Sequence, residues 1–296
     1  IRRVFEVAQG IPIPTDRRLI HAERHEYLLD SQNGIRNPTG MVGTRLEVSV
    51  HLVTASMLAH DNLVTAVNRA GIEVKDTVLE PLAAAEACLT ADERELGVAL
   101  LDIGRGSSEL VIYGEGSLRH TTTIPVGGEY FTNDVAVGLR TPVPEAERLK
   151  LAWKDAEPAD LKGAFEVPSV GGRPPRVVDG SMLREIIEPR ALELMELTDQ
   201  ELLRAHFGQL GAGMVLAGGG AKLSGLVPLA ERTLKMPVRI GQPSGIEEMG
   251  EVLPDPAFAA AVGLALYGNR RRLLESSQEP GWADRLKKIF GGGDDE

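Results

Sequence analysis

The chain has 296 residues, and its 43% hydrophobic and 25% charged residues are ordinary for a globular protein with one large or two medium domains. A net charge of −11 argues against nucleic-acid binding, and no apolar run approaches the ~20 residues that span a bilayer. The single cysteine, Cys88, cannot form an internal disulfide, which fits a reducing cytoplasm. Six scattered histidines give no metal-ligand cluster of ordinary spacing.

The first third of the chain predicts alternating strands and helices. Alternation over residues 42–54 predicts a half-buried strand, and helical spacing over 57–70 predicts a helix that ends at Gly71. A strand is expected over 72–79. Pro81, which suits a first helical turn, then favours a helix over 81–89. This order predicts an α/β layer with a mixed sheet.

Residues 100–113, LLDIGRGSSELVIY, predict two strands joined by a loop of unusual composition. Asp102 at the strand end can hold a hydrated divalent cation. Gly104 and Gly106 let backbone N–H groups approach a phosphate closely, and Ser107 adds a hydroxyl donor. The alternative is an ordinary hairpin turn.

The second half of the chain has a less regular pattern. Residues 154–180 are rich in proline, glycine and charge, and predict an inserted loop with short strands. A long helix is expected to begin near Ser181, with Ser181 as its cap. A short buried strand over 213–217 precedes three glycines, and a final helix is expected over 256–268, followed by a polar linker.

Two further motifs have a binding interpretation and a structural one. Glu147 and Lys150 lie three apart on one helix face, where they could hold ribose hydroxyls or simply pair with each other in solvent. The glycine run 218–220 lies between a strand and a helix. It could form an anion-binding nucleotide loop or a tight packing turn.

These three motifs occur in the order in which the sugar kinase, Hsp70 and actin superfamily surrounds ATP. The segments SVGGRPPR, IIEPR and GGGAKLSGLVPLAE, together with the loop above, resemble the bacterial cell-division family FtsA over essentially the whole chain. The resemblance implies an α/β, actin-like (ribonuclease H-like) ATPase fold with two lobes and a C-terminal amphipathic helix. It also implies a fold incomplete at the N-terminus, because the family's first phosphate loop is missing from this sequence.

The resemblance implies the following division of the chain: an FtsA-specific inserted subdomain over 1–76; a first actin-like lobe over 77–125 and 250–270; a second lobe over 126–249, with a partner-binding insertion at about 143–190; a linker over 271–280; and a membrane-targeting tail over 281–296.

It also implies ATP and Mg²⁺ as ligands, with hydrolysis that is slow at most. Glu80 would orient the attacking water, although a carboxylate at a helix start is also favoured by the helix dipole. Arg105 stands where the family usually has a small residue; unless the position needs a positive φ, its guanidinium could touch phosphate. The implied nucleotide contacts are Asp102 (through water to Mg²⁺), Gly104, Gly106 and Ser107 at the phosphates, Glu147 and Lys150 at the ribose, and Gly218, Gly219 and Gly220 at the adenosine.

The implied partners are proteins and lipid. Arg176 and Arg190, with Arg173 nearby, match the family's basic positions that receive the FtsZ C-terminal peptide, which suits an acidic or terminal-carboxylate ligand. Residues 1–76 would help to join copies head to tail in a filament and to meet later division proteins. No nucleic-acid partner is expected.

The tail, PGWADRLKKIFGGGDDE, has a pattern that stands without any family. On a helix, Trp282, Leu286, Ile289 and Phe290 fall within an arc of about 100°, with basic residues opposite, as in a helix that lies in a membrane interface. The alternative is a final helix packed on the core. Because carboxylates outnumber basic residues in 282–296, one tail should bind weakly and a filament with many tails should bind well.

Together, these features predict a peripheral adaptor on the cytoplasmic side of the bacterial cell membrane, at the division site, that tethers FtsZ filaments. The alternatives are a small-molecule kinase, an Hsp70-like chaperone and a pilus-assembly relative. No motif supplies the acceptor-facing aspartate of a kinase, and no peptide-binding domain follows the last glycine loop. A pilus-assembly relative lacks SVGGRPPR and the tail.

Overall fold

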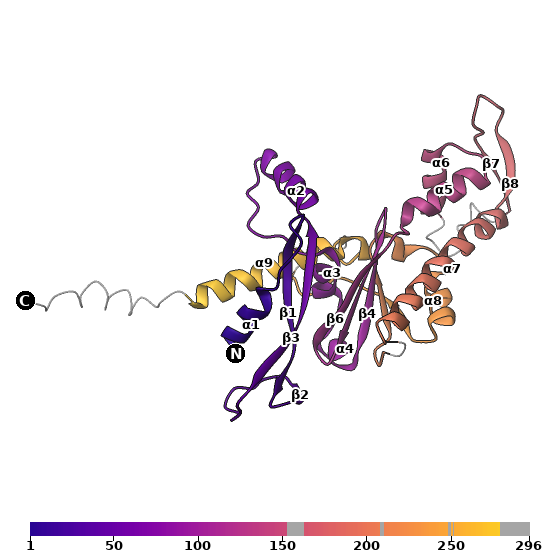
Figure 1. Ribbon diagram of the computed structural model, residues 1–296. Coiled ribbons are helices and arrows are strands. Elements are labelled where there is room, and N and C mark those ends of the chain that lie inside the picture. Colours follow the sequence, from indigo (N-terminus) through magenta and orange to yellow (C-terminus); the bar gives the residue numbers. More distant parts are fainter. Residues whose placement is uncertain (153–162, 208–209, 248–249, 251, 279–296) are drawn as a thin grey trace, which may run out of the picture.

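The computed structural model describes residues 1–152, 163–207, 210–247, 250 and 252–278. These residues form an elongated molecule with a three-stranded sheet at one end, a five-stranded sheet in the middle and a mainly helical arm at the other end (Figure 1).

The N-terminal unit is an antiparallel sheet in the order β2-β1-β3, flanked by two helices. The helix predicted over 57–70 is present as α2, where the Ser56 hydroxyl accepts a hydrogen bond from the Ala59 amide, and Gly71 has φ 82°. The strand predicted over 42–54 begins later, at Leu46. The elements are α1 (Arg2–Gln9), β1 (Arg17–Leu29), β2 (Gln32–Ile35), β3 (Leu46–Ser56) and α2 (Met57–Arg69).

The strand predicted over 72–79 is wrong, because these residues have no regular structure. Their backbone donors bond to side chains instead of a neighbouring strand. The Val74 amide donates to Asn68 Oδ1 at 3.3 Å, and the Leu79 amide donates to His21 Nε2 at 2.9 Å. The segment therefore connects α2 to α3 (Glu80–Cys88), which begins with Pro81 in its first turn as predicted.

The central sheet has the order β10-β9-β4-β5-β6. β4 and β5 form the predicted hairpin, and β9 lies parallel to β4 on its other side. The predicted lobe boundary at 125/126 would place β4 in the first lobe and β9 in the second. It is wrong for these two strands, because they are hydrogen-bonded neighbours in one sheet. The strands are β4 (Val98–Ile103), β5 (Ser108–Gly114), β6 (Ser117–Ile124), β9 (Met214–Ala217) and β10 (Val238–Ile240).

Helices cover both faces of this sheet, so β4 is buried along its whole length. Alternate β4 side chains belong to different cores: Leu100 packs with α3 and α9 (Ala259–Gln278), whereas Leu101 packs with the helices of the arm. The helices α3 and α9 cross so closely that a Cβ at Gly263 would lie 1.7 Å from the Ala83 carbonyl oxygen. Only glycine fits at that crossing.

The arm holds a two-stranded ribbon, as the prediction of short strands within an inserted segment requires. The predicted cap at Ser181 is wrong, because Asp179 Oδ1 accepts the Ser181 amide at 2.8 Å and Ser181 is already helical. The elements are α5 (Gly128–Gly138), α6 (Val143–Ala152), β7 (Ala164–Val167), β8 (Arg176–Asp179), α7 (Ser181–Arg204) and α8 (Leu226–Leu234). Elsewhere, the described residues also form α4 (Ala91–Leu96) and the 3₁₀ turns η2 (Gly219–Lys222) and η3 (Pro256–Phe258).

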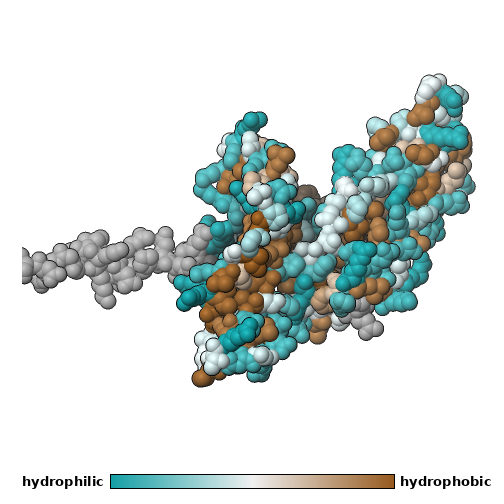
Figure 2. All heavy atoms as spheres, viewed as in Figure 1, coloured by the Kyte–Doolittle hydropathy of each residue, from teal (hydrophilic) through white to brown (hydrophobic). Residues whose placement is uncertain are grey.

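The predicted linker over 271–280 is wrong for 271–278, because α9 continues to Gln278. Two of its arginines hold this part of the helix to the body: Arg270 pairs with Glu86 at 2.6 Å, and Arg271 pairs with Asp76. None of the described helices combines the length and hydropathy that crossing a membrane requires. Figure 2 shows apolar side chains gathered over α1 and the three-stranded sheet. Exposed apolar residues of the N-terminal unit include Ile1, Val7 and Ile11.

Candidate functional site

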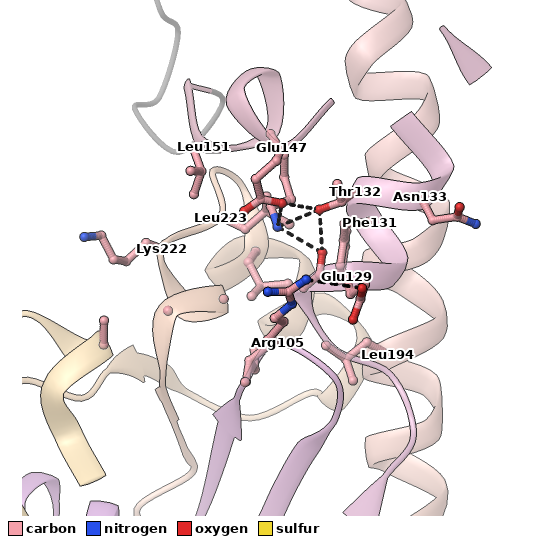
Figure 3. A pocket seen from close by; sticks show the side chains of 18 of the residues that line it. Arg105, Glu129, Phe131, Thr132, Asn133, Glu147, Leu151, Leu194, Lys222 and Leu223 are labelled. Atoms are coloured by element: carbon pink, nitrogen blue, oxygen red, sulfur yellow. Dashed lines mark hydrogen bonds and ion pairs between the residues drawn. The ribbon is translucent and has the colours of Figure 1, made fainter. Parts of the chain in front are cut away.

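A cavity of about 720 Å³ opens between the β4–β5 loop, the start of α5, helix α6 and the turn η2 (Figure 3). Five of the predicted nucleotide-binding residues line it: Gly104, Glu147, Lys150, Gly219 and Gly220. Asp102, Gly106, Ser107, Gly218 and the predicted water-orienting Glu80 are not part of its lining. Residues that are more than a hundred positions apart in sequence therefore meet at one cavity.

The β4–β5 loop is held in place by the start of α5. The Gly104 amide donates to the Ser107 carbonyl at 3.0 Å and closes the loop. The amides of Gly128 and Glu129 donate to the carbonyls of Gly104 and Arg105, at 2.9 and 2.8 Å. The contact is so tight that a Cβ at Gly127 would lie 2.6 Å from the Ser107 amide nitrogen.

Lys150 is fixed by three acceptors deep in the cavity wall. Its Nζ lies 2.8 Å from Glu147 Oε2 and donates to the Gly128 carbonyl and to Thr132 Oγ1, both at 2.9 Å. The Lys150 side chain is only 12% exposed, so this pair is not the solvated pair that the sequence also allowed. The Thr132 hydroxyl donates to Glu147. Burial raises the pKa of Glu147, but the hydrogen bonds from Lys150 and Thr132 outweigh it and lower the pKa overall.

The glycine turn after β9 serves both packing and the cavity. Gly218 has φ 78°, and a Cβ there would lie 2.3 Å from Asp102 Oδ1. A Cβ at Gly220 would lie 2.2 Å from Ile103 Cγ2, whereas a Cβ at Gly219 would meet nothing within 4 Å. The turn therefore packs on the end of β4 through Gly218 and Gly220 and leaves open space at Gly219.

A buried carboxylate lies behind the cavity. Asp102 is 3% exposed, and burial, with smaller contributions from Glu80 and Glu109, raises its pKa to about 7. Burial also raises the pKa of Glu109, although Ser107 Oγ donates to it at 2.6 Å. Glu80, itself exposed at the start of α3, is thus close enough to Asp102 to raise its pKa. Among the described residues, no three histidine, cysteine or acidic side chains converge as metal ligands.

Arg105 adopts a negative φ, so its position in the loop does not require glycine. Its side chain is 86% exposed and lines the cavity, with Nη2 3.4 Å from Glu129 Oε1.

The predicted partner-binding arginines both contact the α5 region, Arg190 along the helix and Arg176 just beyond its C-terminal end. Arg190 Nε pairs with Asp134 at 2.7 Å, and its guanidinium also contacts Glu193 and lies 5.6 Å from the centre of the Tyr130 ring. Arg176 donates to the Leu139 carbonyl. Both are therefore engaged within the chain, and their role toward a partner stays a prediction. The tail residues Trp282, Leu286, Ile289 and Phe290 lie outside the described residues.

Two contributors to the site were missed from sequence. Thr132 joins Lys150 to Glu147, and the pair Gly127–Gly128 lets α5 approach the loop. The glycine pair directly before a helix was an available signal, since it permits close approach of backbone to a neighbouring loop.

Comparison with protein-family models shows to which family the chain belongs. The model of the family "Cell division protein FtsA" matches residues 99–263, and the model "SHS2 domain inserted in FTSA" matches residues 1–54. The chain belongs to the FtsA family. The first match includes every part of the cavity.

Curated FtsA proteins match over most of the chain. The protein of Pseudomonas aeruginosa is 45% identical over 276 residues, which cover 92% of this chain and 66% of that protein. The protein of Escherichia coli is 38% identical over 284 residues, which cover 92% and 67%. The chain therefore spans about two thirds of the length of these relatives.

Solved structures show the actin-like fold. The chain of a PilM–PilN type IV pilus biogenesis complex superposes with a TM-score of 0.63 at 21% identity, covering 90% of this chain and 71% of that one. MreB5 of Spiroplasma citri bound to ADP has a TM-score of 0.60 at 17% identity, covering 76% and 69%. The expected α/β, actin-like fold is confirmed.

Proposed function

We propose that the cavity binds ATP with Mg²⁺ and that the protein is an actin-like adaptor that links FtsZ filaments to the membrane during division. The observation that supports this most is the fixed Lys150–Glu147 pair, which faces the glycine turn at Gly219 across one cavity. A volume of about 720 Å³ suits a nucleotide, since ligand cavities are typically about 300–1,000 Å³.

The residues present fit a nucleotide. The open space at Gly219 leaves room for an adenosine against the η2 backbone, and the Glu147 carboxylate offers an acceptor to ribose hydroxyls. Lys150 holds that carboxylate in place and would donate to the ribose itself only by exchanging one of its three present acceptors. The β4–β5 loop, with Gly104, Gly106 and Ser107, would receive the phosphates. Asp102 would hold Mg²⁺ through water. Its pKa is raised because the carboxylate is buried and has acidic neighbours, and a nearby cation would offset both effects by stabilising the charged form.

Bound ATP would supply a transferable phosphate, and its hydrolysis would be slow and regulatory. Glu80 is the candidate for orienting that water, since its charge acts on Asp102. ATP would chiefly hold the two sides of the cavity together and so favour assembly.

The adaptor role follows from the family and from the tail. In this proposal, Arg176 and Arg190 receive the acidic C-terminal peptide of FtsZ, copies assemble head to tail through the N-terminal unit, and later division proteins bind to the assembled form. Arg190 would have to exchange Asp134 or Glu193 for a peptide carboxylate. The tail would place the protein at the cytoplasmic face of the membrane.

The membrane anchor is tested by co-sedimentation with anionic vesicles. The full chain should pellet with lipid, and a chain ending at Gln278 should stay in the supernatant. Phe290→Asp removes one apolar position and should abolish pelleting, whereas the matched change Asp295→Asn, which removes a repulsive charge, should increase it. If the chain ending at Gln278 pellets equally well, the tail is not the anchor.

The nucleotide site is tested by titrating the 296-residue chain with ATP in the presence and absence of Mg²⁺. Saturable binding that Lys150→Met abolishes supports the site. Absence of binding by the unchanged chain would refute it.

A further inference from the structure

Among the residues that the structure describes, three cationic and two acidic side chains line the cavity: Arg105, Lys150, Lys222, Glu129 and Glu147. With glycine at position 105 these described charges would balance, so Arg105 makes the described lining net positive. Its side chain rises from the β4–β5 loop toward the middle of the cavity (Figure 3).

The two lysines are committed to other groups. Lys150 is 12% exposed and bonded to Glu147, Gly128 and Thr132. Lys222 pairs with Asp255, and in Figure 3 it extends away from Arg105. Neither can turn to a ligand without breaking an ion pair.

The side chain of Arg105, in contrast, is held only weakly, whereas its backbone is held firmly. Its guanidinium lies 3.4 Å from the Glu129 carboxylate; the two side chains are 86% and 60% exposed, and such exposed pairs contribute little to stability. Its carbonyl accepts the Glu129 amide at 2.8 Å, which fixes the loop against α5. The guanidinium can therefore reorient about a fixed anchor. Its effect on the pKa of Glu147 shows that it lies within electrostatic reach of the deeper part of the cavity.

We propose that Arg105 is a phosphate-binding residue that makes the cavity prefer a nucleoside triphosphate over a nucleoside, and that Glu129 competes with the phosphates for it. This inference rests on the proposed nucleotide site. A planar guanidinium with its fork of N–H donors suits bidentate contact with phosphate oxygens. Because Arg105 has a negative φ, the arginine adds this function without backbone strain.

The structure predicts opposite effects for the two partners. Arg105→Ala removes the cation and should weaken ATP binding about tenfold at low salt, with less than a twofold effect on adenosine. Arg105→Lys keeps the charge but not the fork and should fall between the two. Glu129→Gln removes the competitor and should tighten ATP binding about two- to threefold.

Arg140→Gly is the matched control. It removes one positive charge at the other end of α5, and its φ of 46° suits glycine, so it should leave both affinities unchanged. Circular dichroism would establish that each variant is folded.

The experiment is a calorimetric titration of the 296-residue chain and its variants with MgATP and with adenosine at low and at moderate salt. A selective loss of ATP affinity in Arg105→Ala, with a weaker salt dependence, supports the inference. Equal ATP affinity in Arg105→Ala and the unchanged chain, or weaker ATP binding in Glu129→Gln, overturns it while leaving the nucleotide site intact. Failure of the unchanged chain to bind either ligand overturns both proposals.

Discussion

The Lys150 ammonium and the Glu147 carboxylate, 2.8 Å apart, form an ion pair within helix α6, and the same ammonium also joins α6 to α5. The lysine is nearly buried and has two further acceptors on α5. Lys150→Met should therefore lower the free energy of unfolding by about 1–3 kcal/mol, because it leaves a partly buried carboxylate without its partner.

The same helix supplies a control. Glu145 and Arg148 form a second pair with the same spacing, but Arg148 is 63% exposed. Arg148→Met should cost less than about 1 kcal/mol. Urea denaturation of both variants compares the pairs, and equal losses would show that burial of Lys150 adds nothing.

Two neighbouring glycines of the turn after β9, Gly218 and Gly219, should differ in how much a substitution by alanine destabilises the protein. Gly218→Ala should destabilise the protein by about 2–4 kcal/mol, because φ is positive and the new Cβ would lie 2.3 Å from Asp102 Oδ1. Gly219→Ala meets no atom within 4 Å and should change stability by less than about 0.5 kcal/mol. Thermal unfolding of the two variants measures this difference; similar melting temperatures would contradict the packing of the turn on β4.

Asp102 predicts a stability that depends on pH. Its pKa of about 7 in the folded protein lies above the ordinary value of 3.8, so the folded state binds the extra proton between these pH values. The contribution of Asp102 to the free energy of unfolding should therefore decrease as pH rises from about 4 to 7, by on the order of 2–4 kcal/mol, and then level off. Asp102→Asn should remove this dependence. Glu80→Gln should weaken it, since Glu80 contributes to the raised pKa. Chemical denaturation across pH 4–8 provides the measurement, and parallel profiles for all three proteins would contradict it.

His21, at the junction of β1 and α3, should make a contribution to stability that depends on pH in the opposite direction. Burial lowers its pKa, and its Nε2 must stay unprotonated to accept the Leu79 amide. As pH falls below about 6.5, the unfolded state gains this proton first and stability is lost. Hydrogen exchange at the Leu79 amide should therefore accelerate on acidification. In His21→Gln, whose amide oxygen replaces Nε2, the exchange rate after correction for intrinsic chemistry should not respond to pH. An unchanged response in the variant would assign the effect to another group.

Elements with local signals were predicted well. Helix α2 has its serine cap and its terminal glycine within one segment, and the β4–β5 hairpin has both strands and the loop within residues 98–114. Strand β1 was missed because its pairing with β3 shifts register near His21 and near Glu26, which breaks the alternation that identifies a strand.

The site was predictable only in its parts. Gly104, Glu147, Lys150 and Gly219 were identified from sequence, but their convergence depends on β9 lying beside β4, and no local pattern encodes that. The role of Thr132 depends on the packing of α5 against α6. The end of α9 was misjudged because ion pairs to Glu86 and Asp76, distant in sequence, hold its polar segment in the helix.

The pairing of β4 with β9 also determines when this protein can fold during its own synthesis. Ala99 lies opposite Met214, so synthesis must advance 115 residues beyond Ala99 before the first residue of β9 exists. At about 5–20 residues per second, this takes roughly 6 to 23 s. Throughout that time β4, one face of which is wholly apolar, has no partner on the edge that later pairs with β9. During that interval the hairpin with β5 can form, but the sheet cannot close. The nascent chain is therefore most exposed to aggregation and to chaperones while the arm is being translated.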